Sequence, residues 1–198
     1  LVSWVQERLG WPRPGQVALV VSALDRWALA EALQSAGCRL LIGDAIFGLG
    51  IPCPFYSLQS FYLASRAFLP ILRHLPIRYL YPLGHKQEVV KPRFVRYYQK
   101  ADIIAGDFHF LRYRMPEDLS GKCIITSTVT KADVAELKKR GVAWLVTAGP
   151  SLEGRSYGSN VLEAICVALL GKEAGFDQAA YPAFLREISW GPRLEKLN

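Results

Sequence analysis

The sequence lacks an apolar run long enough to cross a bilayer. Its most apolar long segment, residues 57–75, is interrupted by Arg66, Pro70 and Arg73, whereas a membrane helix needs roughly 18 or more apolar residues in succession. The first ten residues, LVSWVQERLG, have the pattern of an amphipathic helix and not that of a signal peptide. We therefore expect no membrane partner. With 51% hydrophobic residues in 198, the chain can bury one large core.

Paired cysteines are also lacking. The four cysteines are scattered without C-x-x-C spacing, at Cys38, Cys53, Cys123 and Cys166. This spacing argues against a disulfide framework and against a zinc site, and it favours buried thiols in a reducing compartment. We therefore expect a cytoplasmic protein.

Acidic residues are scarce in one region. Between Ser57 and Lys100 the only acid is Glu88, against eight basic residues, and this excess equals the net charge of +7. A basic region favours an anionic partner, which can be a phosphate-bearing cofactor, a carboxylate substrate or nucleic acid. Nucleic acid ranks last, because no binding motif is present and four tyrosines of the region have the spacing of buried helix positions: Tyr62, Tyr79, Tyr97 and Tyr98.

Short apolar runs alternate with helical patterns along the chain. The runs predict strands at 17–21, 40–42, 101–107, 123–126 and 142–147, and the helical patterns fall at 26–36, 57–74, 92–100, 131–140 and 159–170, with a last short helix from Tyr181 and a polar tail. This alternation predicts an α/β fold, a three-layer Rossmann-like parallel sheet with helices on both faces. Residues 47–100 are expected to form an inserted helical segment over the carboxyl edge of the sheet, beginning with an irregular loop at 47–56.

The turn after the first strand is the first candidate site. Here a dinucleotide-binding fold carries G-x-G-x-x-G, but Ser22 and Ala23 stand where glycines are expected. Ser22, Asp25 and Arg26 are candidates for binding a phosphate or a ribose. The alternative interpretation is that Asp25 only caps the following helix.

Asp44 follows the second strand, about 20 residues beyond that turn. An acid at this spacing binds the ribose hydroxyls of NAD and disfavours the extra phosphate of NADP. NAD is therefore the favoured one of the two cofactors. The alternative is an ordinary turn acid, because strands often end in Gly-Asp.

The central strand ends abruptly in Gly106-Asp107. In open α/β folds ligands lie at such carboxyl ends, which makes Asp107 and His109 candidates for a general acid or base, together with Lys86. The alternative is that Asp107 caps the turn and that His109 is a solvated loop residue. No H-x-x-x-H or similar spacing supports a metal, so we expect none.

Two further loops carry polar residues to the same edge. Thr126 closes a strand and is a candidate cofactor contact, while Thr130 is well placed to cap the next helix. The loop 154–160 contains Arg155, Ser156 and Asn160, which together with a helix start form a plausible oxyanion or phosphate cradle. The alternative for this loop is that Ser159 or Asn160 is only the N-cap.

Four segments together resemble a bacterial family labelled quinate 5-dehydrogenase: SALDRW (22–27), YPLGHKQE (81–88), AGDFHF (105–110) and LEGRSYGSN (152–160). The resemblance implies a Rossmann domain, related to shikimate dehydrogenases, that oxidises a ring hydroxyl of quinate with NAD or NADP. Members ordinarily carry an N-terminal region, which we expect to be missing from this chain. The catalytic Lys-Asp pair of shikimate dehydrogenases has no match here.

The leading hypothesis is therefore an NAD(P)-dependent oxidoreductase that acts on a small polyhydroxylated carboxylate, with Lys86 or Arg155 holding the substrate carboxylate. The alternative is a non-catalytic module that binds a nucleotide or another phosphorylated ligand, and the third is a nucleic-acid binder. The identity of the substrate and the oligomeric state, a homo-oligomer included, stay open.

Overall fold

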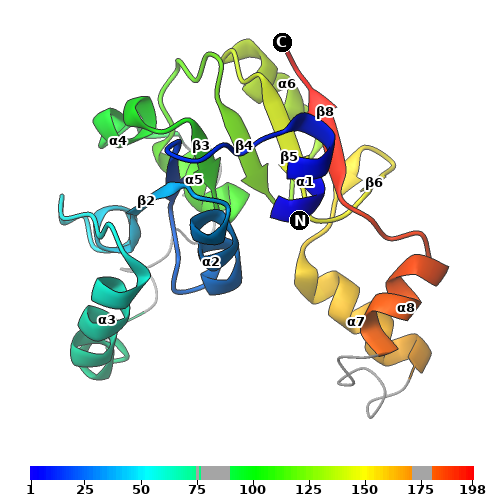
Figure 1. Ribbon diagram of the computed structural model, residues 1–198, viewed down its shortest axis with the longest axis horizontal. Coiled ribbons are helices and arrows are strands. Elements are labelled where there is room, and N and C mark those ends of the chain that lie inside the picture. The colour runs from blue at the N-terminus through cyan, green and yellow to red at the C-terminus, as the bar shows by residue number, and fades with distance from the viewer. Residues whose placement is uncertain (75, 77–89, 171–179) are drawn as a thin grey trace.

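A six-stranded sheet forms the centre of the molecule (Figure 1). The computed structural model describes residues 1–74, 76, 90–170 and 180–198. The strands are β1 (Val17–Val20), β2 (Arg39–Ile42), β3 (Ile103–Ala105), β4 (Cys123–Thr126), β5 (Trp144–Thr147) and β8 (Arg193–Lys196), in the order β2-β1-β3-β4-β5-β8. The first five are parallel and β8 runs antiparallel to β5. The predicted Rossmann-like α/β fold is confirmed.

Both faces of the sheet are buried, as the short apolar runs require. Successive side chains of a strand point to opposite faces. Along β1, Leu19 belongs to one core cluster, while Ala18 and Val20 belong to the other. Because every strand residue from Ala18 to Val20 is fully buried, the sheet needs a helical layer on each side.

Two layers of helices cover these faces. On one side α4 (Val95–Lys100), α5 (Phe108–Arg114) and α6 (Lys131–Lys139) contribute Tyr98, Phe108 and Leu137 to the core. On the other side α1 (Val2–Leu9) and α2 (Trp27–Ser35) contribute Val5 and Leu33. The fold is therefore three-layered.

The remaining elements are η1 (Asp44–Gly48), α3 (Leu58–Leu72), α7 (Ser159–Leu170), α8 (Ala180–Glu187) and a small hairpin of β6 (Ser151–Leu152) and β7 (Arg155–Ser156). Helix α3 starts beside α2, where Phe61 stacks on Trp27 with ring centroids 6.2 Å apart. In Figure 1, α3 and the α7–α8 pair extend below the sheet on opposite sides of the molecule. Of the predicted insert 47–100, α3 thus begins beside α2, and α4 belongs to a helical layer.

Local sequence signals account for several element boundaries. Thr130 forms the expected capping box with Asp133 at the start of α6, and Ser57 Oγ accepts a 3.2 Å hydrogen bond from Ser60 N at the start of α3. The expected loop at 47–56 is confirmed from residue 49 onwards, while its first two residues belong to the π-helical turn η1. The expectation of a polar tail was wrong: these residues form β8, because Leu194 and Leu197 pack against the core.

Candidate functional site at the carboxyl edge of the sheet

The carboxyl ends of the parallel strands lie in one row. Val20 pairs with Ala105 across β1 and β3, and Thr126 pairs with Thr147 across β4 and β5. The chain leaves β1 towards β2 on one side, and β3 lies on the other side. The order 2-1-3-4-5 is one of the common doubly wound orders, and its crevice opens between β1 and β3. A predicted site residue that lies beside this crevice can contact a ligand bound there.

Asp107 stands at the end of β3, where it caps α5. Its Oδ1 accepts hydrogen bonds from His109 N at 3.0 Å and from Phe110 N at 3.4 Å. Its Oδ2 lies 3.7 Å from Arg26 Nη2. The capping interpretation of Asp107 is thus confirmed, whereas the loop interpretation of His109 was wrong, because His109 lies in the first turn of α5. Arg26, Asp107 and His109 are brought together beside the β1–β3 crevice.

Asp44 binds the turn that follows β1. Its Oδ2 lies 2.7 Å from Ala23 N and its Oδ1 lies 2.9 Å from Leu24 N. Burial raises the pKa of Asp44 to about 6, against the opposing effect of these backbone donors. The carboxylate therefore occupies the backbone N–H groups on which a dinucleotide-binding fold places its pyrophosphate. The turn-acid interpretation describes this geometry, and the role of Asp44 in binding the ribose of a nicotinamide cofactor stays a prediction.

The rest of the β1–α2 turn also differs from the expectation. Arg26, not Asp25, is the N-cap residue of α2, and its side chain makes no capping hydrogen bond. The carboxylate of Asp25 is exposed and its Oδ2 lies 3.4 Å from Arg26 Nε, so the predicted cap by Asp25 was wrong. Ser22 is half-buried in the turn.

Strands β4 and β5 each end in a threonine. Thr126 Oγ1 donates to Gly106 O at 2.8 Å, Thr147 Oγ1 donates to Gly149 O at 2.7 Å, and Ser156 Oγ donates to Thr147 Oγ1 at 3.4 Å. Both hydroxyls are buried and bonded inside the chain. The contacts of Thr126 with a cofactor and of Ser156 with a substrate stay predictions. Sequence reasoning missed Thr147, although it ends its strand as Thr126 does.

Arg155 and Lys131 flank the hairpin glycine Gly154. Arg155 is exposed, with its guanidinium carbon 5.8 Å from the Tyr157 ring centroid. Lys131 lies against Gly154 so closely that a Cβ on the glycine would overlap its side chain. Within the described ranges, no carboxylate lies within ion-pair distance of either cation. Asn160 is exposed in the first turn of α7, where Val161 N and Leu162 N donate to Gly158 O at 3.2 and 3.4 Å.

Several predicted residues take no part in this arrangement. Lys86 and Tyr79 lie outside the described residues. Tyr97 and Tyr98 are buried, and their hydroxyls donate to Pro52 O at 3.1 Å and to Leu111 O at 3.0 Å. These two rings are therefore not available to stack on nucleic-acid bases.

Two absences apply to the part of the chain that the structure describes. No helix there has the length and apolarity to cross a membrane. No group of three or more His, Cys, Asp or Glu side chains there is arranged to hold a metal ion. All four cysteines are free; Cys53 is exposed, unlike the three buried ones.

A family model described as "Domain of unknown function (DUF8754)" matches residues 1–197. The chain belongs to this family. No curated protein and no solved structure matches it. The family description states no activity, so the resemblance to quinate 5-dehydrogenases stays a prediction.

Proposed function

We propose that the protein binds a small phosphorylated or carboxylate-bearing ligand at the carboxyl edge of the sheet, between the β6–β7 hairpin and the start of α7. The observation that carries this proposal is the presence of two cations at Gly154: the Lys131 side chain lies against this glycine and Arg155 follows it in the chain, and neither has an acidic partner among the described residues. Each of these cations attracts an anion.

The surroundings of these cations support an anionic ligand. Helix α7 has 12 residues, and the N-terminus of a helix carries a partial positive charge. Thr128 Oγ1 lies 3.1 Å from the place of a Cβ on Gly158, so the hydroxyl faces the backbone just before α7. Thr128 therefore adds a hydroxyl group beside the start of α7.

A thermal-shift titration of the whole chain tests the proposal, with inorganic phosphate, ATP, quinate and shikimate as probes. A ligand at about 100 times its dissociation constant adds roughly 2.7 kcal/mol of stability, which shifts the midpoint measurably. We expect the Arg155→Gln and Lys131→Gln variants to lose the shift and the matched Lys139→Gln variant, an exposed cation at the other end of α6, to keep it. If none of the probes shifts the wild-type midpoint, the proposal is wrong.

An NAD(P)-dependent oxidoreductase of quinate or shikimate is the second proposal. Besides the resemblance, it is supported by Arg26, Asp107 and His109, which lie together beside the β1–β3 crevice, where α/β enzymes bind ligands. In this proposal Arg26 attracts the anionic substrate, and Asp107 or His109 handles the proton of the reacting hydroxyl. Asp44 opposes it, because a pyrophosphate at the β1–α2 turn meets a carboxylate.

The two proposals differ in their response to a nicotinamide cofactor. Stabilisation by NAD or NADP that increases with quinate, together with formation of reduced cofactor, supports the oxidoreductase. Stabilisation by phosphate or ATP alone supports the binding module. In both cases we place the protein in the cytoplasm, which the four free cysteines support.

A further inference from the structure

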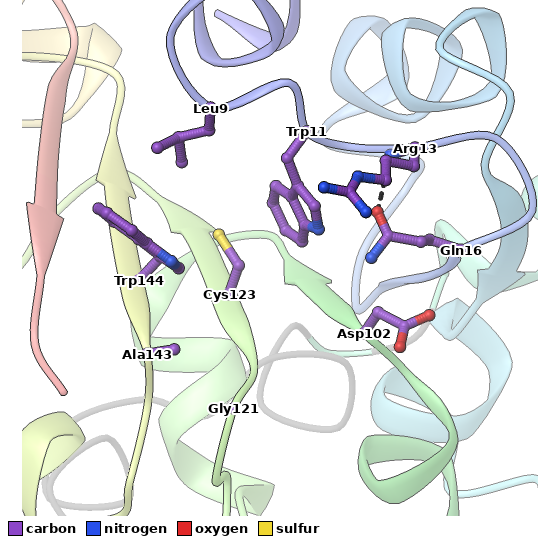
Figure 2. Close-up of a pocket in the computed structure, with 9 residues that line it drawn as sticks. All are labelled: Leu9, Trp11, Arg13, Gln16, Asp102, Gly121, Cys123, Ala143 and Trp144. Carbon is purple, nitrogen blue, oxygen red and sulfur yellow. Dashed lines mark hydrogen bonds between the residues drawn. The ribbon is translucent and has the colours of Figure 1, made fainter.

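A cavity of about 320 Å³ lies at the opposite edge of the sheet, at the amino ends of the strands (Figure 2). Gln16 precedes β1, Asp102 precedes β3 and Trp144 begins β5, and each of them lines it. The connector after α1 closes the cavity with Trp11 and Arg13. None of these residues belongs to the carboxyl-edge site, so the cavity is a separate feature of the fold.

Two indole rings and an aliphatic side chain form the apolar part of a lining that is otherwise polar. Trp11 and Trp144 are half-buried and pack against the core cluster that includes Cys123, while Leu9 of α1 adds an aliphatic side chain. Figure 2 shows the thiol of Cys123 directed between the two indoles. The two indoles favour a planar ring in the ligand, because indole faces stack on other aromatic rings.

The polar groups at the rim are hydrogen-bond donors. Gln16 Oε1 accepts a 2.7 Å hydrogen bond from Arg13 N, which leaves Nε2 of Gln16 as a fixed donor. In Figure 2 the side chains of Arg13 and Gln16 both extend towards Trp11. Among the described residues, the Arg13 guanidinium has no carboxylate within ion-pair distance.

Asp102, the acid that lines the cavity, is hydrogen-bonded to the neighbouring strand β1. Asp102 Oδ2 accepts a 2.8 Å hydrogen bond from Val17 N, and in Figure 2 its carboxylate points away from Trp11. The neighbouring cation, Lys122, donates to Gln99 O at 3.1 Å and to Ala101 O at 2.7 Å. The groups left to meet a ligand are therefore the donors of Arg13 and Gln16.

We propose that this cavity binds a planar aromatic ring with hydrogen-bond acceptors on one edge, the ring lying against Trp11 and Trp144 and the acceptors facing Arg13 and Gln16. Ligand pockets measure about 300–1,000 Å³, so this one takes a single ring system without a long substituent. Two sources supply this chemistry. A nucleobase such as guanine carries two acceptors, O6 and N7, on one edge, and an aromatic acid carries a carboxylate.

The test is isothermal titration of the whole chain with guanosine and with benzoate, and with ribose and acetate as probes that lack the ring. We expect saturable binding of at least one aromatic probe and none of ribose or acetate. Binding of guanosine alone identifies a nucleobase, and binding of benzoate alone identifies an aromatic acid. If neither aromatic probe binds, the proposal is overturned.

Two variants locate the binding. Ala143→Leu fills the cavity without removing a polar group and should abolish binding. Arg13→Gln removes an exposed charge and should weaken binding about tenfold or more, which corresponds to one charge-assisted hydrogen bond. Arg8→Gln, an exposed cation of α1 that does not line the cavity, should bind as the wild type does. Unchanged affinity in the Arg13→Gln variant refutes the site even if Ala143→Leu does not fold.

Discussion

The backbone N–H of Ala23 donates a 2.7 Å hydrogen bond to Oδ2 of Asp44, so the acid that follows β2 holds the turn that follows β1. Leu24 N donates to the other carboxylate oxygen. The turn thus has an internal anion at the position where related folds bind an external one. An external anion is therefore expected at the β4 and β5 ends of the sheet and not at the β1–α2 turn, because two cations there have no acidic partner among the described residues.

The half-buried Asp44 carboxyl should make stability depend on pH. Its pKa rises from 3.8 to about 6 on folding, so the folded state binds the proton more tightly than the unfolded state. Its contribution to the free energy of unfolding is therefore fully present below about pH 4 and is lost as the pH rises through about 6. We expect a loss on the order of 2–3 kcal/mol.

Urea unfolding of the wild type and of Asp44→Asn at several pH values across this window measures the effect. The difference between the two proteins should change with pH, because the amide does not titrate. Glu163→Gln, an exposed residue of α7, serves as the control and should follow the wild type. A constant difference between wild type and Asp44→Asn across the window would mean that Asp44 is ionised throughout.

Substitutions of Asp107 separate its capping role from a chemical one. Asparagine caps helices about as well as aspartate, so Asp107→Asn should keep the free energy of unfolding within about 0.5 kcal/mol of the wild type. Asp107→Ala removes the cap of α5 and should cost about 1 kcal/mol. Denaturant unfolding of both variants checks this, and equal stabilities would contradict the cap. If the oxidoreductase proposal holds, Asp107→Asn should lose turnover without losing stability.

Gly106 allows β3 to pass close to β1. Its φ is +148°, and a Cβ there would overlap Cγ2 of the buried Val21. We expect Gly106→Ala to destabilise the protein by roughly 1–3 kcal/mol, in the range of other overpacked cores. Val21→Ala in the same chain should recover part of this loss, since the two positions are in contact.

Gly191→Ala is the matched control for Gly106, because no atom lies near the position of its Cβ. The measurement is thermal unfolding of the wild type, of the Gly106→Ala, Val21→Ala and Gly191→Ala variants, and of the double variant. Additive losses in the double variant would show that the cost at Gly106 comes from backbone conformation and not from contact with Val21.

Local patterns predicted most of the elements. The β-branched run at 17–21, the Thr130 cap and the Gly43-Asp44 strand end each depend on a few neighbouring residues. The prediction was wrong for an element that depends on contacts between distant parts of the chain. Residues 193–196 read as a polar tail, and they form a strand only because β5 offers an open edge.

The sequence by itself determined the α/β class, the parallel core strands and the polar residues at their carboxyl ends, because hydrophobic periodicity and turn chemistry act between neighbouring residues. The tertiary structure alone decided which of those polar groups are used internally and which have no partner. Asp44 reaches Ala23, and Arg26 approaches Asp107, only after the strands have paired. Such contacts join segments far apart in the chain, and they depend on strand order, which no short pattern encodes.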